Sequence, residues 1–187
     1  MIKIGNTKVT VLNDGGKRLG KFDIEHMCKM IASQKNNLNY LRLIKVKTTI
    51  NAPIQWWIEY KDFHKNKKYK DDDILFNYDK YWELFPKPFR TDMFDGLYTC
   101  YVGMDEYIRF LNNVRADAIL NDNAEIYRQL VGLLPLNYHI KLDVELNYEN
   151  IYRIYKHYKN TDDVNWINFI NWVNNLPYNY IFTEKGE

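Results

Sequence analysis

The chain has 187 residues, of which 46% are hydrophobic and 27% charged, and its formal net charge is +2 at pH 7. This composition is typical of a folded domain with a real core and excludes wholesale disorder. So small a net charge provides no global field for nucleic acid, and the sequence therefore argues against nucleic acid as a partner. Aromatic residues, at 16%, are the main departure from average and favour a large contact surface.

Two isolated cysteines, Cys28 and Cys100, have no CxxC spacing and indicate a reducing, cytoplasmic setting. Residues 1–11 alternate polar and apolar side chains, so we expect no signal peptide, and no run approaches the ~18 apolar residues of a membrane span. None of the four histidines has a second ligand at a recognised spacing, so no metal site is expected.

The first third of the chain predicts strands around a helix. Residues 8–12 read as a short strand, and the glycine-rich residues 13–16 read as a tight turn, so we predict an N-terminal hairpin. Apolar spacing over residues 24–31 predicts an amphipathic helix. Residues 40–50 alternate in a period of two, which predicts a strand with one apolar face and a partly basic opposite face.

Two adjacent tryptophans follow that strand. Pro53 is predicted to begin a helix, because proline's missing N–H would have no partner in the first turn. On this helix Ile54, Trp57 and Ile58 share one face, and Trp56, Tyr60 and Phe63 cover an adjoining one. So wide an apolar surface is buried on two sides of the monomer, packed against a partner chain, or lining a pocket. The candidate interface residues are Trp56, Trp57 and Tyr60.

A basic run over residues 61–70 ends in three aspartates. Its lysines and aromatics have the composition of a phosphate-contact loop, whereas a solvated loop is the commoner role for such a run. The aspartates would cancel most of its field within a Debye length of about 8 Å. Whether this loop contacts phosphate is open on sequence grounds.

Helices and one strand fill the remainder of the chain. Helices are predicted over residues 74–84, 104–118 and 123–134, and a half-buried strand over residues 138–147. Asn147 is a candidate N-cap for the next helix, and a last helix ends before Pro177. We therefore expect one α+β domain over residues 1–187, with a small, mostly antiparallel sheet of three or four strands and about six helices.

Residues 48–55, Thr-Thr-Ile-Asn-Ala-Pro-Ile-Gln, combine a predicted strand, a helix start and a glutamine. Further along the chain follow, in order, Leu134-Pro135, Asn147-Tyr148-Glu149 and Leu176-Pro177. In these landmarks and their order the chain resembles a remote, phage-type branch of the flavin-dependent thymidylate synthases. The resemblance spans about residues 20 to 177.

The family's reaction motif is absent from the chain. Ile58-Glu59-Tyr60 stands where the family has Arg-His-Arg, and Tyr158 stands at a later arginine. In the family these arginines hold the nucleotide phosphate and orient the flavin. A guanidinium donates two parallel hydrogen bonds that tyrosine or glutamate cannot reproduce. The resemblance therefore implies that the chain keeps the family's fold but does not perform the family's reaction.

The resemblance also implies a ligand site. We expect a phage-encoded protein in the host cytoplasm, a homo-oligomer that binds a nucleotide or flavin between subunits, with FAD as the candidate cofactor. Whether it catalyses any reaction is open. The candidate ligand-binding residues are Gln55, Glu59, His64, Asn147, Arg153 and Lys156.

The alternative is a protein with no catalytic role. In this interpretation a phage factor binds and inhibits a host nucleic-acid-directed or defence complex, and the tryptophan helix supplies contact residues. A retained small molecule would favour the first interpretation, and a stoichiometric protein partner would favour the second.

Overall fold

The computed structural model describes residues 1–11, 20, 25, 39–64, 87–95 and 103–183. Several predicted features lie outside this part of the chain: the turn over residues 13–16, most of the helix over residues 24–31, the basic run beyond residue 64, and the helix over residues 74–84.

The chain divides into two compact units, and each is described by itself below. The first unit consists of Met1 and Ala52–Lys141, and the second of Ile2–Asn51 and Leu142–Glu187. Across the described residues the structure has four strands in one sheet and six α-helices, which confirms the α+β prediction. None of the helices described is both long and apolar enough to cross a membrane.

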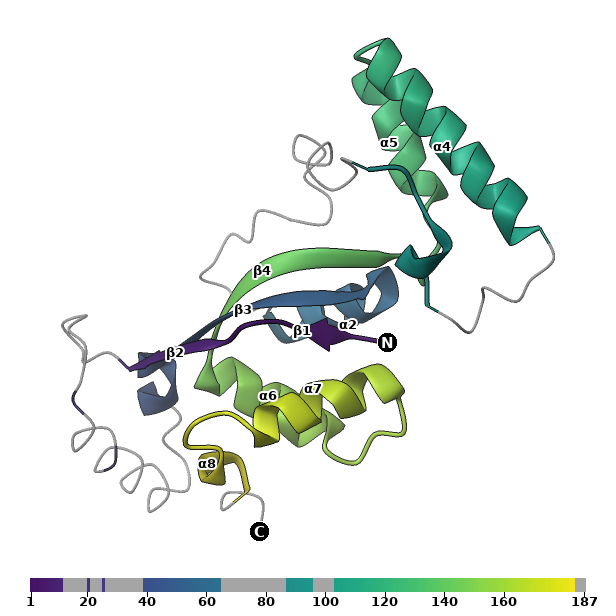
Figure 1. Ribbon diagram of the computed structural model, residues 1–187. Coiled ribbons are helices and arrows are strands. Elements are labelled where there is room, and N and C mark those ends of the chain that lie inside the picture. Colours follow the sequence, from purple (N-terminus) through teal and green to yellow (C-terminus); the bar gives the residue numbers. More distant parts are fainter. Residues whose placement is uncertain (12–19, 21–24, 26–38, 65–86, 96–102, 184–187) are drawn as a thin grey trace. The chain divides into compact units, whose positions relative to one another are not determined.

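Strand β3 (Ile44–Pro53) is the central strand of the sheet. It pairs antiparallel with β1 (Lys3–Ile4) and β2 (Lys8–Val11), and it also pairs with β4 (His139–Asn147) (Figure 1). The prediction of a strand from residue 40 was wrong at its start, because Asn39–Leu43 form a 3-10 helix, η1. The tighter turn buries Leu41 completely and leaves Arg42 exposed at the surface.

The period of two along β3 is confirmed. One face carries Ile44, Val46, Thr48 and Ile50, which are at most 4% exposed, and the opposite face carries the two lysines between them. In the second unit, helices α6 (Tyr148–Tyr158) and α7 (Val164–Asn174) lie along one side of the sheet (Figure 1). The apolar side of the sheet and these two helices form the core of this unit.

A bulge lies between β1 and β2, the two strands that pair in turn with β3. Ile4 lies opposite Ile50 and Lys8 lies opposite Lys47, so three residues of one strand, 5–7, face two of the other, 48–49. Below the bulge the Thr7 hydroxyl lies 3.1 Å from the Thr48 hydroxyl and accepts a hydrogen bond from Trp172 Nε1 at 3.0 Å. These side chains fix the bulge to α7.

Helices α4 (Met104–Leu120) and α5 (Ala124–Leu133) form a hairpin in the first unit (Figure 1). Asn123 caps α5, and its side chain accepts hydrogen bonds from two backbone N–H groups of the first turn. Both helices were predicted to within about two residues. The short elements η3 (Thr91–Met93) and α8 (Tyr180–Thr183) were not predicted.

Helix α2 (Ile54–His64) begins directly after Pro53, which ends β3. The first N–H groups of a helix have no partner within it. Here Ile54 N–H donates to the Tyr138 carbonyl at 2.9 Å and Gln55 N–H donates to the Leu136 carbonyl at 3.0 Å. The start of α2 is therefore fixed by the turn that leads into β4.

The paired tryptophans of α2 are buried. Trp56 and Trp57 are each 2% exposed and Tyr60 is 7% exposed, with ring centroids 5.0 to 5.4 Å apart. Trp57 Nε1 donates to the Ile140 carbonyl at 3.1 Å. Ile58, which the helical pattern placed beside Trp57 on an apolar face, is instead 41% exposed. Burial within the monomer, packing against a partner chain and lining a pocket were the three alternatives for this helix. The structure shows the tryptophans buried within the chain.

Trp56→Ala should lower the free energy of unfolding by about 3 to 5 kcal/mol, because it leaves a large cavity in a closely packed aromatic cluster. The matched control on the same helix is Ile58→Ala, which we expect to cost less than about 1 kcal/mol, since its side chain is partly exposed. Urea denaturation monitored by circular dichroism measures both. Equal losses for the two variants would contradict the burial described for Trp56.

Candidate functional site

Two arginines share one buried carboxylate in the second unit. Arg42 of η1 donates from Nε and Nη2 to Glu149, the second of these bonds measuring 3.3 Å. Arg153, one turn further along α6, donates from Nη2 to Glu149 Oε1 at 2.6 Å. The Glu149 side chain is 6% exposed, whereas those of Arg42 and Arg153 are 57% and 41% exposed.

The cluster joins two guanidiniums to one carboxylate, and both arginine side chains remain partly exposed. The hydrogen bond from Arg42 lowers the pKa of Glu149 and outweighs the opposite effect of burial, and Arg153 lowers it further. Glu149 is therefore ionised at neutral pH.

This arrangement holds the two planar guanidinium groups in place. A carboxylate that accepts from both arginines restricts their side-chain rotamers, which reduces the entropy lost when a ligand binds. Guanidinium groups match the geometry of phosphate oxygens and bind them through parallel hydrogen bonds. The cluster is thus chemically suited to an anion that carries a phosphate group, and it provides no nucleophile or general base.

Three candidate ligand residues lie at or near this cluster on α6. Arg153 is part of it, and Lys156 is exposed three residues later. Asn147 is instead the N-cap of α6: its side chain accepts from Asn150 N–H at 2.9 Å, and Asn150 Oδ1 accepts from Asn147 N–H at 3.3 Å. The Asn147 side chain therefore serves the helix start.

The other three candidates lie on α2, in the first unit. Gln55 Nε2 donates to Glu59 Oε1 at 3.5 Å, so the two exposed or half-exposed side chains contact each other. His64 is the last residue of α2, and its side chain lies outside what the structure describes. The structure therefore groups five of the six candidates, as a pair on α2 and as three residues along α6 and its N-cap.

A second charged cluster lies in the first unit. The Asp95 carboxylate accepts from the α-ammonium of Met1, and His139 Nε2 lies 3.5 Å from Asp95 Oδ1. Burial raises the pKa of Asp95, but Met1 and His139 together lower it below its usual value. With its side chain only 9% exposed, His139 has the surroundings of a structural histidine.

No group of three or more histidine, cysteine or acidic side chains could hold a metal ion among the residues described. No protein-family model, curated protein or solved structure matches this chain. What the candidate site binds is therefore inferred from the geometry of its own residues.

Sequence reasoning identified Arg153 and missed Glu149 and Arg42. The spacing of Glu149 and Arg153, four residues apart on a helix, was a usable signal for an ion pair. Arg42 is 107 residues from Glu149 in the chain and gave no comparable signal.

Glu149→Gln should lower the free energy of unfolding by about 1 to 3 kcal/mol at pH 7, because the charge-assisted hydrogen bonds from both arginines are lost. The folded-state pKa of Glu149 is lowered below its ordinary value of 4.5. Its contribution is therefore complete above about pH 5 and is lost as the pH falls through the folded-state pKa.

Urea denaturation of wild type and variant from pH 7 down to pH 3 tests this. The difference between them should be largest at pH 7 and shrink at the acid end. Glu145→Gln, whose side chain is 49% exposed, is the control and should have little effect at any pH. A difference for Glu149→Gln that does not change with pH would count against the ionised cluster.

Proposed function

We propose that this protein binds a phosphate-bearing nucleotide through Arg42 and Arg153. The observation that carries the proposal is the pair of partly exposed guanidiniums held on one buried carboxylate. We place the protein as a divergent, phage-encoded relative of the flavin-dependent thymidylate synthases that binds the nucleotide and does not perform their reaction. In support, β3 leads through Pro53 into α2, and an arginine-bearing helix follows β4.

Two features favour a phosphate group as the part of the ligand that is recognised. Arg42 and Arg153 come from separate elements and converge on Glu149, so their spacing is set by the fold and not by one flexible loop. Lys156 lies exposed on the same helix and adds a further positive charge. The predicted arginine position of the family is Tyr158, whereas Arg153 lies five residues earlier on α6 and on a different side of the helix, so it supplies a guanidinium of its own and not the family's.

The structure gives less support to a flavin as the ligand than to a phosphate group. A flavin ring needs an accessible aromatic face on which to stack. The two indoles expected to supply it, Trp56 and Trp57, are each 2% exposed. We therefore base the proposal on the phosphate group and derive no chemistry from FAD, while including it among the ligands to be tested.

The alternative of a phage interaction protein stays a prediction. Its expected contact residues were Trp56, Trp57, Tyr60 and the basic loop over residues 61–70. The three aromatic side chains are buried, and the loop beyond residue 64 lies outside the described residues, so this alternative now depends on the loop. The homo-oligomer implied by the family resemblance likewise stays a prediction, which light scattering of the purified protein would check.

Arg153→Gln and Arg42→Gln should each weaken nucleotide binding by about tenfold or more, because each removes a charge-assisted hydrogen bond to phosphate. Isothermal titration calorimetry with deoxyuridylate, FAD and inorganic phosphate measures this. Arg153→Lys keeps the charge but loses the fork, so it should recover only part of the affinity.

Arg109→Gln is the matched control, since Arg109 is an exposed arginine of α4 in the first unit. It removes the same charge and should leave binding unchanged. An unchanged urea midpoint for each variant separates impaired binding from impaired folding. Wild-type protein that is colourless and shows neither heat of binding nor thermal shift with any of the three ligands would refute the proposal.

A further inference from the structure

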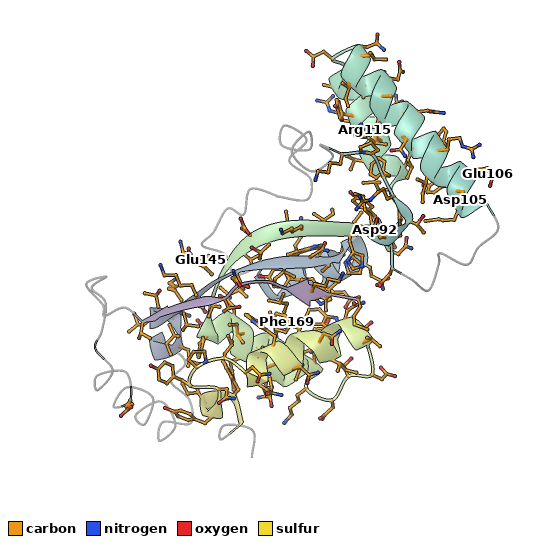
Figure 2. All side chains as sticks on the ribbon, in the orientation of Figure 1. Asp92, Asp105, Glu106, Arg115, Glu145 and Phe169 are labelled. Atoms are coloured by element: carbon orange, nitrogen blue, oxygen red, sulfur yellow. The ribbon has the colours of Figure 1, made fainter. Side chains whose placement is uncertain are left out.

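The side of the sheet opposite α6 and α7 is rich in lysine. The register of the strands places four lysines on this outer face: Lys3, Lys8, Lys45 and Lys47. Two acidic residues of β4 share it, Asp143 and Glu145, each through a contact with β3. In Figure 2 Glu145 lies on the outer side of the sheet, whereas Phe169 of α7 lies on the inner side. Among the described strand residues of the second unit, four lysines and two carboxylates give this face a formal charge of +2.

Two of these lysines are direct neighbours across the sheet. Lys8 is the register partner of Lys47, and like charges in that position destabilise a sheet. Lys47 is partly neutralised by Glu145, at 2.8 Å. Lys45 follows on the same face of β3, about 6.6 Å along the strand. Positive charge is therefore in local excess at the end of the face that carries Lys8, Lys45 and Lys47.

Protection of a sheet edge does not explain why all four lysines lie on this face. Lysines on an edge strand hinder pairing with another chain, which accounts for Lys3 and Lys8. Lys45 and Lys47 lie on β3, which has paired strands on both sides and needs no such protection. Their position calls for another explanation, such as a negatively charged partner.

An open hollow of about 490 Å³ lies on this face beside the bulge. Its lining consists of Asn6, Lys8, Lys47, Thr48, Thr49, Asp143, Val144 and Glu145. Of the polar groups that line it, the Asn6 amide can donate a hydrogen bond to an anion that the two lysines attract, whereas the hydroxyls of Thr48 and Thr49 already donate to the Gly5 carbonyl and to Asp143. The hollow is therefore large and polar enough to accept a phosphate group.

We propose that this outer face binds the phosphate backbone of a nucleic acid without reading its bases. A protein partner would call for an aromatic or apolar centre to the interface, in which lysine is depleted. Strand positions directed to this face carry only lysine, threonine, asparagine, aspartate and glutamate in the second unit. With no aromatic ring on which bases could stack, the contact is to phosphates and is independent of sequence.

The test uses the double variant Lys8→Gln/Lys45→Gln, which leaves the pair of Lys47 and Glu145 intact. Its matched control, Lys87→Gln/Arg109→Gln, removes two exposed charges from the first unit, outside both proposed sites. Fluorescence anisotropy with labelled DNA of about 20 nucleotides, in two unrelated sequences, is measured between about 50 and 200 mM salt. Labelled polyglutamate of similar charge is the competing probe.

Wild type should bind both sequences alike, and its affinity should fall steeply with salt. For Lys8→Gln/Lys45→Gln the slope of log K against log salt should decrease by about 2, because two lysines no longer neutralise a phosphate each. The control should keep the wild-type slope. Urea midpoints and deoxyuridylate binding should be unchanged in Lys8→Gln/Lys45→Gln, so a failure here is distinct from a failure of the proposed nucleotide site.

Four outcomes would overturn the proposal. They are undetectable binding at 50 mM salt, an unchanged slope for Lys8→Gln/Lys45→Gln, an equal decrease in slope for Lys87→Gln/Arg109→Gln, and tighter binding of polyglutamate than of DNA. The third would show that the position of the removed charges does not matter, and the fourth would indicate an acidic protein partner.

Discussion

Burial of one face of β3 is the constraint on which the two proposed sites depend. Because side chains alternate along a strand, enclosing Ile44, Val46, Thr48 and Ile50 obliges Lys45 and Lys47 to point the other way. A slip of one residue would bury both lysines without partners, at a large cost in desolvation. The same register places η1, which precedes the strand, where Arg42 can reach Glu149 on α6. One apolar stripe thus fixes the location of both basic surfaces.

The cluster of Arg42, Glu149 and Arg153 has a structural role as well as a proposed binding role. A buried carboxylate is unfavourable unless hydrogen bonds compensate its missing hydration, and here both arginines supply them. Each arginine remains partly exposed and undergoes little desolvation of its own. The cluster therefore ties η1 to α6 at modest cost while keeping positive charge at the surface. The proposed phosphate site follows from that asymmetry between a buried anion and exposed cations.

Periodicity and capping made much of the fold predictable. The alternation over residues 138–147 and the N-cap Asn147 depend on neighbours in the chain, and both were predicted correctly. The burial of Trp56 and Trp57 could not be decided, because a helical pattern shows which residues share a face and not what covers it. The partnership of Arg42 with Glu149 joins distant parts of the chain, so only the tertiary structure reveals it.

Net charge describes the whole chain and not how its charges are distributed. A value of +2 over 187 residues is too small for long-range attraction, and that argument against nucleic acid concerns the global field alone. Pairing β2 with β3 places Lys8, Lys45 and Lys47 within a Debye length of about 8 Å of one another. Their fields add over that distance, while the acidic residues that balance the total lie mostly on other elements. A nearly neutral chain can therefore present a locally basic face, which the strand register determines and the composition does not.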